Sequence, residues 1–571
     1  MDATVDHREG GYRHPVDWAL HFAPLSLPAM LETAAARAPD APLIDFFGRK
    51  FAYADVLSKS CRVAAGLAAL GLGRGERVAL LLPNVPHYVV AYYGVLRLGA
   101  VVVNLSPLAP IELLREQVDA TGTRLLITLT AAPLYEIALD LLDSSALGRV
   151  VAGGVASALP KGKALLHRMM QREVSPSRHS DRRVTSFDSL VANDGAVPIA
   201  AIDPCTDLAL LQYSGGTTGM PKAAMFTHQA LSANARQIVA VDPSGGLAGQ
   251  GRPQRIIGVL PLFHIFANAC VMNRTIAEGG EMVLLPRFDA GETIAAIART
   301  RATTMCGVPF MYQALLDHPR IAAADLGSLT TVVSGAAAMP AATKTRFERI
   351  SGATLLEGYG LTEGGMVSAN PLQGPQKPGS VGQPLPGTRI ELVDRDDPTR
   401  AAAPGEAGEI IVQGPQITMG FWGGDDPRAL IERPDGRWLR TGDIGTIDTD
   451  GYVRIVDRLA EMIPVGGCKV FPSQIEAILQ RHPVVHEALV IGVDDGAAGQ
   501  LPKAFATLVE GAAVEGEALR DWLNARVGRH EQVVAVEVRA RLPRTSVGKP
   551  SRQDMIAEER RRTMPPDAPT A

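Results

Sequence analysis

Short apolar runs alternate with longer amphipathic segments through the first part of the chain. The runs are short and mostly apolar, which is typical of buried strands. After the first run, Pro86 suits the first turn of a helix that continues to Leu98 and stops at Gly99, and residues 110–119 predict a second helix. The predicted strands are ERVALLLP (76–83), AVVVNL (100–105) and TRLLITL (123–129). This alternation predicts α/β layers with parallel strands.

The pattern changes past residue 384, where short strands and turns follow one another in TRIELVD, GEIIVQG and GYVRIVDR. Around residue 459 a further unit begins, and QIEAILQRHPVVHEALVIGV predicts a helix followed by a strand. The final EERRRTMPPDAPTA is charged and proline-rich, which favours disorder. We therefore predict a flexible N-terminal arm (1–22), a large domain (23–457), a small α+β domain (458–555) and a disordered tail (556–571).

Composition narrows the class of protein. A chain of 571 residues that is 46% hydrophobic and 20% charged predicts a globular protein of several structural units. A net charge of −4 argues against non-specific nucleic-acid binding. The five cysteines are scattered without a CxxC pair, which favours a reducing compartment over a disulfide framework or a zinc site. Without a signal peptide or a long apolar run, we expect a cytoplasmic protein with no transmembrane segment.

Residues 160–183 form a basic segment in which Glu173 and Asp181 are the acidic residues. One interpretation is a solvated surface connection, and the other is a peripheral membrane or anionic-ligand contact. The basic residues are Lys161, Lys163, Arg168, Arg172, Arg178, Arg182 and Arg183, and the apolar ones beside them are Leu165, Leu166, Met169 and Met170.

The stretch LQYSGGTTGMPKAAMFTH (211–228) is typical of a phosphate-binding loop. It differs from the nucleotide-binding pattern G-x-x-x-x-G-K-[ST], because Pro221 precedes its lysine and Ala223 follows it. Backbone N–H groups of a glycine-rich turn still form an anion-binding concavity, to which hydroxyls and a lysine add donors. The predicted phosphate-binding residues are Ser214, Gly215, Gly216, Thr217, Thr218, Gly219 and Lys222.

This loop resembles the signature of the adenylate-forming superfamily, which includes acyl-CoA synthetases, luciferases and peptide-synthetase adenylation domains. Members make an acyl-adenylate from a carboxylate and ATP. The resemblance extends from about residue 25 to 555. It implies a fold of layered α/β subdomains plus a β-rich subdomain in the large AMP-binding domain, with the small C-terminal domain acting as a mobile catalytic lid.

LLEGYGLTEGG (355–365) resembles the Y-G-x-T-E element of the superfamily. The resemblance implies that Tyr359 stacks on adenine, that Thr362 touches phosphate, and that Glu363 holds Mg²⁺ together with Thr218. A carboxylate among triphosphate oxygens needs a cation between them. The alternatives are a core aromatic for Tyr359 and a surface carboxylate for Glu363. The neighbouring residues assigned to ATP or AMP are Glu357, Gly358 and Gly360, with Gly335 and Ala336 from SGAAAMP (334–340), which resembles the adenine wall.

RTGDIG (440–445) resembles the T-G-D motif, in which Asp443 accepts hydrogen bonds from the ribose hydroxyls. Arg458 falls where the superfamily has a ribose-contacting arginine. Gly466 and Gly467 fall at the pantetheine tunnel, where a residue without Cβ allows close approach. The alternatives are a turn for the aspartate, a surface ion pair for the arginine and simple turn glycines.

LPRTSVGK (542–549) resembles the C-terminal catalytic loop and implies that Lys549 lies between the acyl carboxylate and the α-phosphate. In PLFHIFAN (261–268), His264 falls where the superfamily borders the carboxylate and gates thiol access, and a buried structural histidine is the alternative. For His228 we favour structural hydrogen bonding. The predicted catalytic residues are Lys549, His264, Thr218 and Glu363.

Two positions depart from the superfamily pattern. The hinge residue is Ala460, where Asp or Lys is usual, so a polar interaction at the pivot is lost. Pro550 follows the catalytic lysine in place of an aliphatic residue. Neither change removes a reacting group.

The resemblance therefore implies an acyl-CoA synthetase that uses ATP, Mg²⁺ and CoA, most similar to those for medium-chain and long-chain fatty acids. The expected acyl-pocket residues are Phe263, Ile265, Val308 and Met366. The alternatives are an acyl-AMP ligase that loads a separate carrier protein, a CoA ligase for a dicarboxylic, aromatic or alicyclic acid, and a non-catalytic nucleotide-binding regulator. A homodimer and the membrane contact stay open.

Overall fold

A computed structural model describes residues 16–170, 181–196, 200–213, 222–242, 254–395, 397–403, 405–424, 429–465, 468–494, 500–545 and 550–563. Side chains are described for these residues apart from 166–170, 460, 468, 469 and 563. Backbone proximity divides the chain into two units. Unit 1 comprises Met1–Ile390, Val412–Leu439 and Thr449–Tyr452, and unit 2 comprises Glu391–Ile411, Arg440–Asp448 and Val453–Ala571. The predicted boundary at 457/458 stays a prediction.

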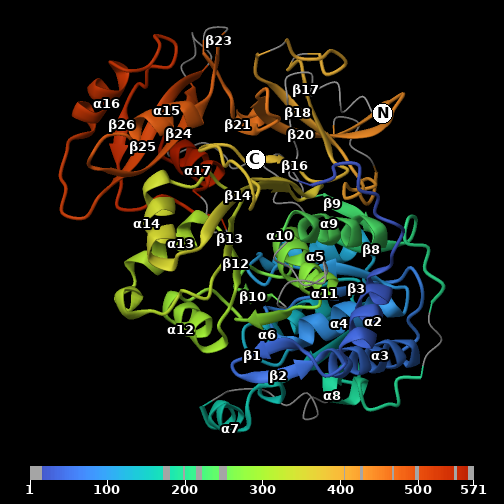
Figure 1. Cartoon of the computed structure of the whole chain (residues 1–571). Coiled ribbons are helices and arrows are strands. Elements are labelled where there is room, and N and C mark those ends of the chain that lie inside the picture. The colour runs from blue at the N-terminus through green and yellow to red at the C-terminus, as the bar shows by residue number, and fades with distance from the viewer. Residues whose placement is uncertain are drawn as a thin grey trace. The chain divides into compact units, whose positions relative to one another are not determined.

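Two large sheets organise the described part of unit 1 (Figure 1). The seven-stranded sheet has the order β7 (Val184–Ser186), β6 (Arg149–Gly153), β5 (Leu125–Leu129), β3 (Arg77–Leu80), β4 (Val101–Asn104), β8 (Leu208–Tyr213), β9 (Ala223–Thr227). The nine-stranded sheet has the order β16 (Gln383–Pro384), β15 (Gly365–Ala369), β14 (Thr354–Leu361), β13 (Thr331–Ser334), β12 (Thr304–Gly307), β10 (Arg255–Gly258), β11 (Glu281–Leu284), β1 (Pro42–Phe46), β2 (Arg49–Ala52). The three predicted strands become β3, β4 and β5, and their mutual pairings are parallel as expected.

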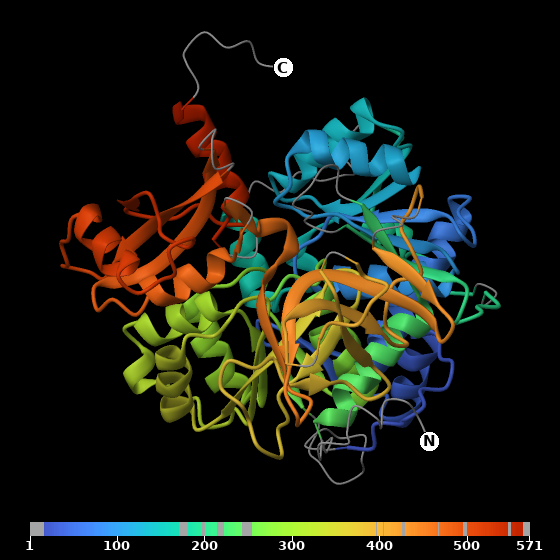
Figure 2. The same cartoon turned by 90° about the horizontal axis from the view of Figure 1, so that it is seen from above.

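Helices lie between and around the two sheets. The helix that begins at Pro86 is α4 (Pro86–Arg97), and the second predicted helix is α5 (Ile111–Thr121). Helix α9 (His228–Val241) packs on β8 and β9 of one sheet and on β15 of the other, so it lies between them. Helices α12 (Ala290–Thr300), α13 (Pro309–Asp317) and α14 (Ala341–Ser351) pack in sequence along the nine-stranded sheet (Figure 2). Further α-helices in the described part of this unit are α2 (Leu27–Arg37), α3 (Tyr53–Ala69), α6 (Leu134–Ser144), α7 (Lys161–Met170), α8 (Phe187–Leu190), α10 (Ile265–Ala267) and α11 (Arg274–Glu278).

The described chain past β16 is rich in short strands, as its sequence pattern predicts. A five-stranded sheet has the order β17 (Arg389–Val393), β18 (Gly408–Gln413), β20 (Gly436–Ile447), β19 (Leu430–Arg433), and β21 (Val453–Arg458) also pairs with β20. Unit 2 contains the pair β22 (Ile463–Val465) and β23 (Cys468–Val470), and a sheet of β24 (Val485–Asp494), β25 (Gln500–Leu508) and β26 (Val536–Val538). Its helices are α15 (Pro472–Leu479), α16 (Gly516–Asn524) and α17 (Arg552–Thr563). The α/β fold class is confirmed.

Helix α17 corrects the predicted start of the disordered tail. Residues 556–563 are helical, so the prediction of disorder from 556 is wrong for them. Met555 is fully buried against Leu489 and Phe505, and Glu559 forms an ion pair with Lys503 of β25. Packing and ion pairing therefore order a segment whose composition alone favours disorder. Residues 564–571 lie outside the described residues.

Candidate active site

The ends of the predicted phosphate loop are held at neighbouring positions of the seven-stranded sheet. The loop residues Ser214, Gly215, Gly216, Thr217, Thr218 and Gly219 lie outside the described residues. Tyr213, the last residue of β8, pairs with Ala223, the first of β9, in antiparallel register. Lys222 is exposed, and its Nζ lies 6.0 Å from the centroid of the Phe421 ring. The loop therefore follows directly from a largely buried strand, β8.

Gly335, Ala336, Glu357 and Gly358 lie together at the end of two parallel strands. Ser334 of β13 is in register with Glu357 of β14, so the turn after β13 adjoins Gly358. A Cβ at Gly335 would lie 3.6 Å from the Gly358 carbonyl oxygen and 3.1 Å from the Phe266 ring. Ala336 has a φ of 71°, a conformation that costs energy for a residue with a side chain and often occurs at ligand sites.

A buried carboxylate fixes this turn to β14. Glu357 accepts a hydrogen bond from the backbone N–H of Met339 at 3.2 Å. Burial raises the pKa of Glu357, and the Met339 hydrogen bond opposes that rise. Because the acceptor comes from β14 and the donor from the turn, the two segments assigned to the nucleotide are held in one arrangement.

Tyr359, Gly360, Thr362 and Glu363 belong to the hairpin of β14 and β15. A Cβ at Gly360 would lie 2.3 Å from the Gly365 carbonyl oxygen, so the hairpin closes only with glycine there. Tyr359, Thr362 and Glu363 are partly exposed. The Glu363 carbonyl oxygen accepts from the backbone N–H of Thr418 at 2.7 Å, which fixes the backbone that carries this carboxylate.

His264 is a neutral imidazole at the start of α10. Burial lowers its pKa to about 4, and its Nε2 has no hydrogen-bond partner among the described residues. Its backbone N–H donates to the Pro261 carbonyl at 3.0 Å, and its ring lies 4.7 Å from the Phe263 ring. Because the ring is uncharged, it can lie beside apolar groups without forming an ion pair with a carboxylate.

A buried hydrogen-bond network holds the loop that leads to His264. Asn84 donates to the carbonyls of Gly258 and Leu260 at 3.0 and 2.8 Å, and it accepts from the Leu262 N–H at 2.8 Å. These three bonds fix the backbone between β10 and α10.

Tyr88 and Gln212 extend the same network to two further elements. The Tyr88 hydroxyl of α4 bonds the Leu262 carbonyl at 3.0 Å and Asn104 Oδ1 at 2.8 Å. Gln212 of β8 donates to the Phe263 carbonyl at 3.0 Å and accepts from Asn104 at 3.0 Å. The strand that enters the phosphate loop is thus bonded directly to the loop that carries His264.

The four expected acyl-pocket residues are all buried in one apolar core. Phe263, Ile265, Val308 and Met366 are each exposed by less than a tenth. The Met366 Sδ lies 3.6 Å from the Cys270 Sγ, and its Cε would lie 2.7 Å from a Cβ at Gly358. Met366 therefore packs between the core and the strand assigned to the nucleotide.

In unit 2, Asp443 and Arg458 face each other across two antiparallel strands. They are in register on β20 and β21, and Asp443 Oδ1 lies 3.2 Å from Arg458 Nε. Asp443 is buried, whereas the Arg458 side chain is half exposed. A buried acceptor beside an accessible donor suits a ligand with vicinal hydroxyls.

The remaining predicted residues of unit 2 lie outside the description. These are Gly466, Gly467 and Lys549, together with the side chain of Ala460. An isolated bridge pairs Arg544 with Pro550, so the ends of the segment that contains Lys549 are held side by side. Arg544 also forms an ion pair with Glu487 at 2.6 Å.

Sequence motifs missed the supporting residues. Asn104 lies in a predicted strand and Tyr88 in a predicted helix. Asn84 lies between two predicted elements and Gln212 in the phosphate-loop motif, and none of these positions indicates a role by itself. Phe266, which packs on Gly335, is one residue beyond the quoted His264 and Ile265.

Comparisons with known proteins cover nearly the whole chain. The family model for AMP-binding enzymes matches residues 31–422, and that for the AMP-binding enzyme C-terminal domain matches 474–549. A long-chain-fatty-acid–CoA ligase of Bacillus subtilis is 37% identical over 94% of this chain and 96% of its own length. A feruloyl-CoA synthase of an Amycolatopsis species is 33% identical over 90% of this chain and 95% of its own.

Solved structures agree with the sequence comparison. The crystal structure of ATP-bound MatB from Rhodopseudomonas palustris matches with a TM-score of 0.80 and 26% identity, covering 94% of this chain and 99% of that chain. The resemblance to adenylate-forming enzymes is confirmed, and the chain belongs to the AMP-binding enzyme family.

Proposed function

We propose that the protein is an AMP-forming acid–CoA ligase whose acid is a medium-chain or long-chain fatty acid. The observation that carries the proposal is the 37% identity to a long-chain-fatty-acid–CoA ligase over 94% of this chain. The geometry supports it, because the neutral His264 adjoins a buried apolar core that includes Phe263 and Met366. Apolar surroundings favour an alkyl chain.

In the first step the acid carboxylate attacks the α-phosphate of ATP, and pyrophosphate leaves. Lys549 places a cation between the two anionic reactants, and the glycine-rich loop with Lys222 holds the departing phosphates. Asp443 and Arg458 bind the ribose, and the turn at Gly335 and Ala336 walls the adenine side.

Glu363 fits the expected magnesium ion. Magnesium takes one or two carboxylates together with substrate phosphate oxygens, so a single partly exposed carboxylate suffices. The described residues contain no cluster of three or more His, Cys, Asp or Glu side chains that could hold a metal ion. Glu363 and Thr218 would hold the ion, which when bound neutralises charge on the triphosphate.

In the second step the CoA thiol attacks the carbonyl of the acyl-adenylate, and AMP leaves. The small domain rotates between the two steps, withdraws Lys549 and presents Gly466 and Gly467 to the pantetheine arm. Ala460 allows the rotation without a polar contact at the pivot.

A second candidate substrate is an aromatic acid. The 33% identity to a feruloyl-CoA synthase over 90% of this chain favours it. The same assay also tests dicarboxylic acids, alicyclic acids and a carrier protein in place of CoA.

The test supplies purified protein with ATP, magnesium, CoA and each acid in turn. We expect AMP, pyrophosphate and acyl-CoA, with the highest kcat/KM for fatty acids. Lys549→Ala should lower the adenylation rate by roughly 10²–10³ with ATP binding retained. Arg541→Ala is the matched control, because it removes an exposed cation that directly precedes the LPRTSVGK motif. Release of ADP, or an unchanged rate for Lys549→Ala, contradicts the proposal.

We also propose a cytoplasmic location, supported by free thiols at Cys61, Cys205, Cys270 and Cys306. None of the helices in the described part of the chain is long and apolar enough to cross a membrane. A homodimer is a separate prediction, which the mass of the purified chain in solution tests.

A further inference from the structure

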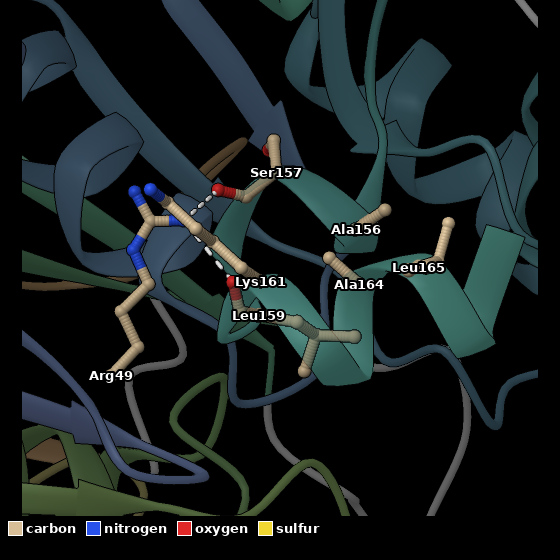
Figure 3. Close-up of a pocket in the computed structure, with 7 residues that line it drawn as sticks. All are labelled: Arg49, Ala156, Ser157, Leu159, Lys161, Ala164 and Leu165. Atoms are coloured by element: carbon tan, nitrogen blue, oxygen red, sulfur yellow. Dashed lines mark hydrogen bonds between the residues drawn. The ribbon is translucent and has the colours of Figure 1, made fainter.

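A pocket of about 400 Å³ lies between β2, the 3-10 helix η1 (Val155–Ala158) and the start of α7 (Figure 3). None of the predicted site residues lines it. The lining residues are Arg49, Ala156, Ser157, Leu159, Lys161, Ala164 and Leu165. Arg49 Nη1 donates to the carbonyls of Ser157 and Leu159, so its guanidinium is fixed at the pocket wall.

The surroundings of this pocket are cationic. Lys161 and Lys163 are exposed, and within the described ranges neither forms an ion pair with a carboxylate. Arg49 Cζ and Lys59 Nζ lie 4.9 and 5.0 Å from the centroid of the same ring, that of Phe51.

The pKa of Lys59 reflects both its burial and the positive charge beside it. Burial lowers the pKa of Lys59, and the neighbouring Arg49 lowers it further, as expected where positive charges crowd. Asp55 and Asp188 face Lys59 and offset part of the charge, whereas Lys161 and Lys163 lack such partners among the described residues.

An exposed apolar side chain lies among these cations. Leu165 is 62% exposed, one turn along α7 from Lys161. The Lys163 ammonium lies 4.9 Å from the Phe47 ring. Lysines that flank an exposed leucine keep their charges in water while their stems and the leucine contact an apolar phase.

We propose that the α7 surface, formed by Arg49, Lys59, Lys161, Lys163 and Leu165, docks on an anionic lipid bilayer. The cations pair with lipid phosphates, the pocket beside Arg49 and Lys161 receives one headgroup, and Leu165 enters the headgroup boundary. Charge complementarity selects an anionic partner, and the exposed leucine favours a bilayer over an acidic protein. This docking does not depend on the acid that the enzyme activates.

The experiment measures co-sedimentation of the full-length protein with phosphatidylcholine vesicles, with and without phosphatidylglycerol. We expect binding only when phosphatidylglycerol is present, and weaker binding as salt rises. Each unit of charge near an anionic surface changes partitioning by about fivefold, and Lys161→Glu changes the charge by two units, so it should reduce binding by about 25-fold. Leu165→Asp should reduce it by a similar factor, because it removes the inserting side chain.

Arg124→Glu is the matched control. Its side chain is 78% exposed and lies 3.9 Å from Glu76. Arg124 directly precedes β5, whereas α7 follows the C-terminal end of β6. Because β5 and β6 are parallel neighbours, the two positions lie at opposite ends of these strands. No binding by the unaltered protein, or an equal loss for Arg124→Glu and Lys161→Glu, overturns the proposal. Acyl-CoA formation in detergent-free buffer without vesicles reports separately on the proposed function.

Discussion

The ion pair between Asp443 and Arg458 gives the sharpest prediction for a single residue. Asp443 is buried and 3.2 Å from the arginine Nε, so both groups are oriented before a nucleotide binds. Asp443→Asn removes the charge but keeps the shape. Because a hydrogen bond to a charged group contributes about 1.5–3 kcal/mol, the KM for ATP should rise roughly ten- to hundredfold in pyrophosphate-exchange kinetics.

A second buried carboxylate, Glu409, provides a control that distinguishes a loss of ATP binding from a loss of stability. Glu409 accepts from Arg440 Nε at 3.0 Å and is almost fully buried. Glu409→Gln should lower the midpoint of urea unfolding while leaving the KM for ATP unchanged. A similar rise in KM for both variants would show that Asp443 acts only through stability.

Single residues also mark where sequence reasoning was sufficient and where it was not. Gly360 could be predicted because a local motif contains it, and the hairpin geometry explains why only glycine fits. Gln212 could not, because its bond to the Phe263 carbonyl joins residues 51 positions apart. Local patterns report periodicity and motifs, and they carry no information on which distant backbone group a buried amide will meet.

At the scale of elements, the bonds from α4 and β8 to the loop before His264 lead to a second prediction. Tyr88→Phe leaves the Leu262 carbonyl and Asn104 Oδ1 without the hydroxyl that bonds both. A loop displaced by this loss should position the acid poorly. We expect kcat/KM for the acid to fall by about tenfold while the KM for ATP changes little.

Tyr93→Phe is the control on the same helix. Tyr93 is also buried, but its hydroxyl bonds Asn273 Oδ1 at 2.7 Å and does not touch the loop. Both variants lose a buried hydroxyl and should lose similar stability, of about 1–3 kcal/mol. Equal losses of kcat/KM in the two variants would contradict a positioning role for Tyr88.

The sequence predicts strands correctly where all the side chains of a strand are buried. The runs that became β3, β4 and β5 are apolar because parallel central strands are covered on both faces. Helix α17 did not follow, because its order depends on ion pairs and on one buried methionine, Met555, in a charged segment.

At the scale of the whole molecule, buried histidines make stability depend on pH. Burial lowers the pKa of His87, His228 and His264 from 6.5 to about 4 in each case. Below about pH 6.5 the unfolded chain binds protons that the folded chain does not, so stability is present above this pH and is lost as the pH falls toward 4. Below about 4 both states are protonated, and these groups cause no further loss.

The free energy of unfolding should therefore fall by up to about 4 kcal/mol per pH unit between about pH 6 and pH 4.5, since three protons are taken up together. Urea unfolding measured across this window checks the slope. His228→Gln should reduce the slope by about a third, because this ring is fully buried. Both of its nitrogens are unpaired among the described residues, so the structural hydrogen bonding expected for His228 from the sequence is not found there. His530→Gln, at an exposed position, is the matched control. A free energy of unfolding that is flat across the window would contradict the prediction, because it would show that the folded protein protonates these rings as readily as the unfolded chain does.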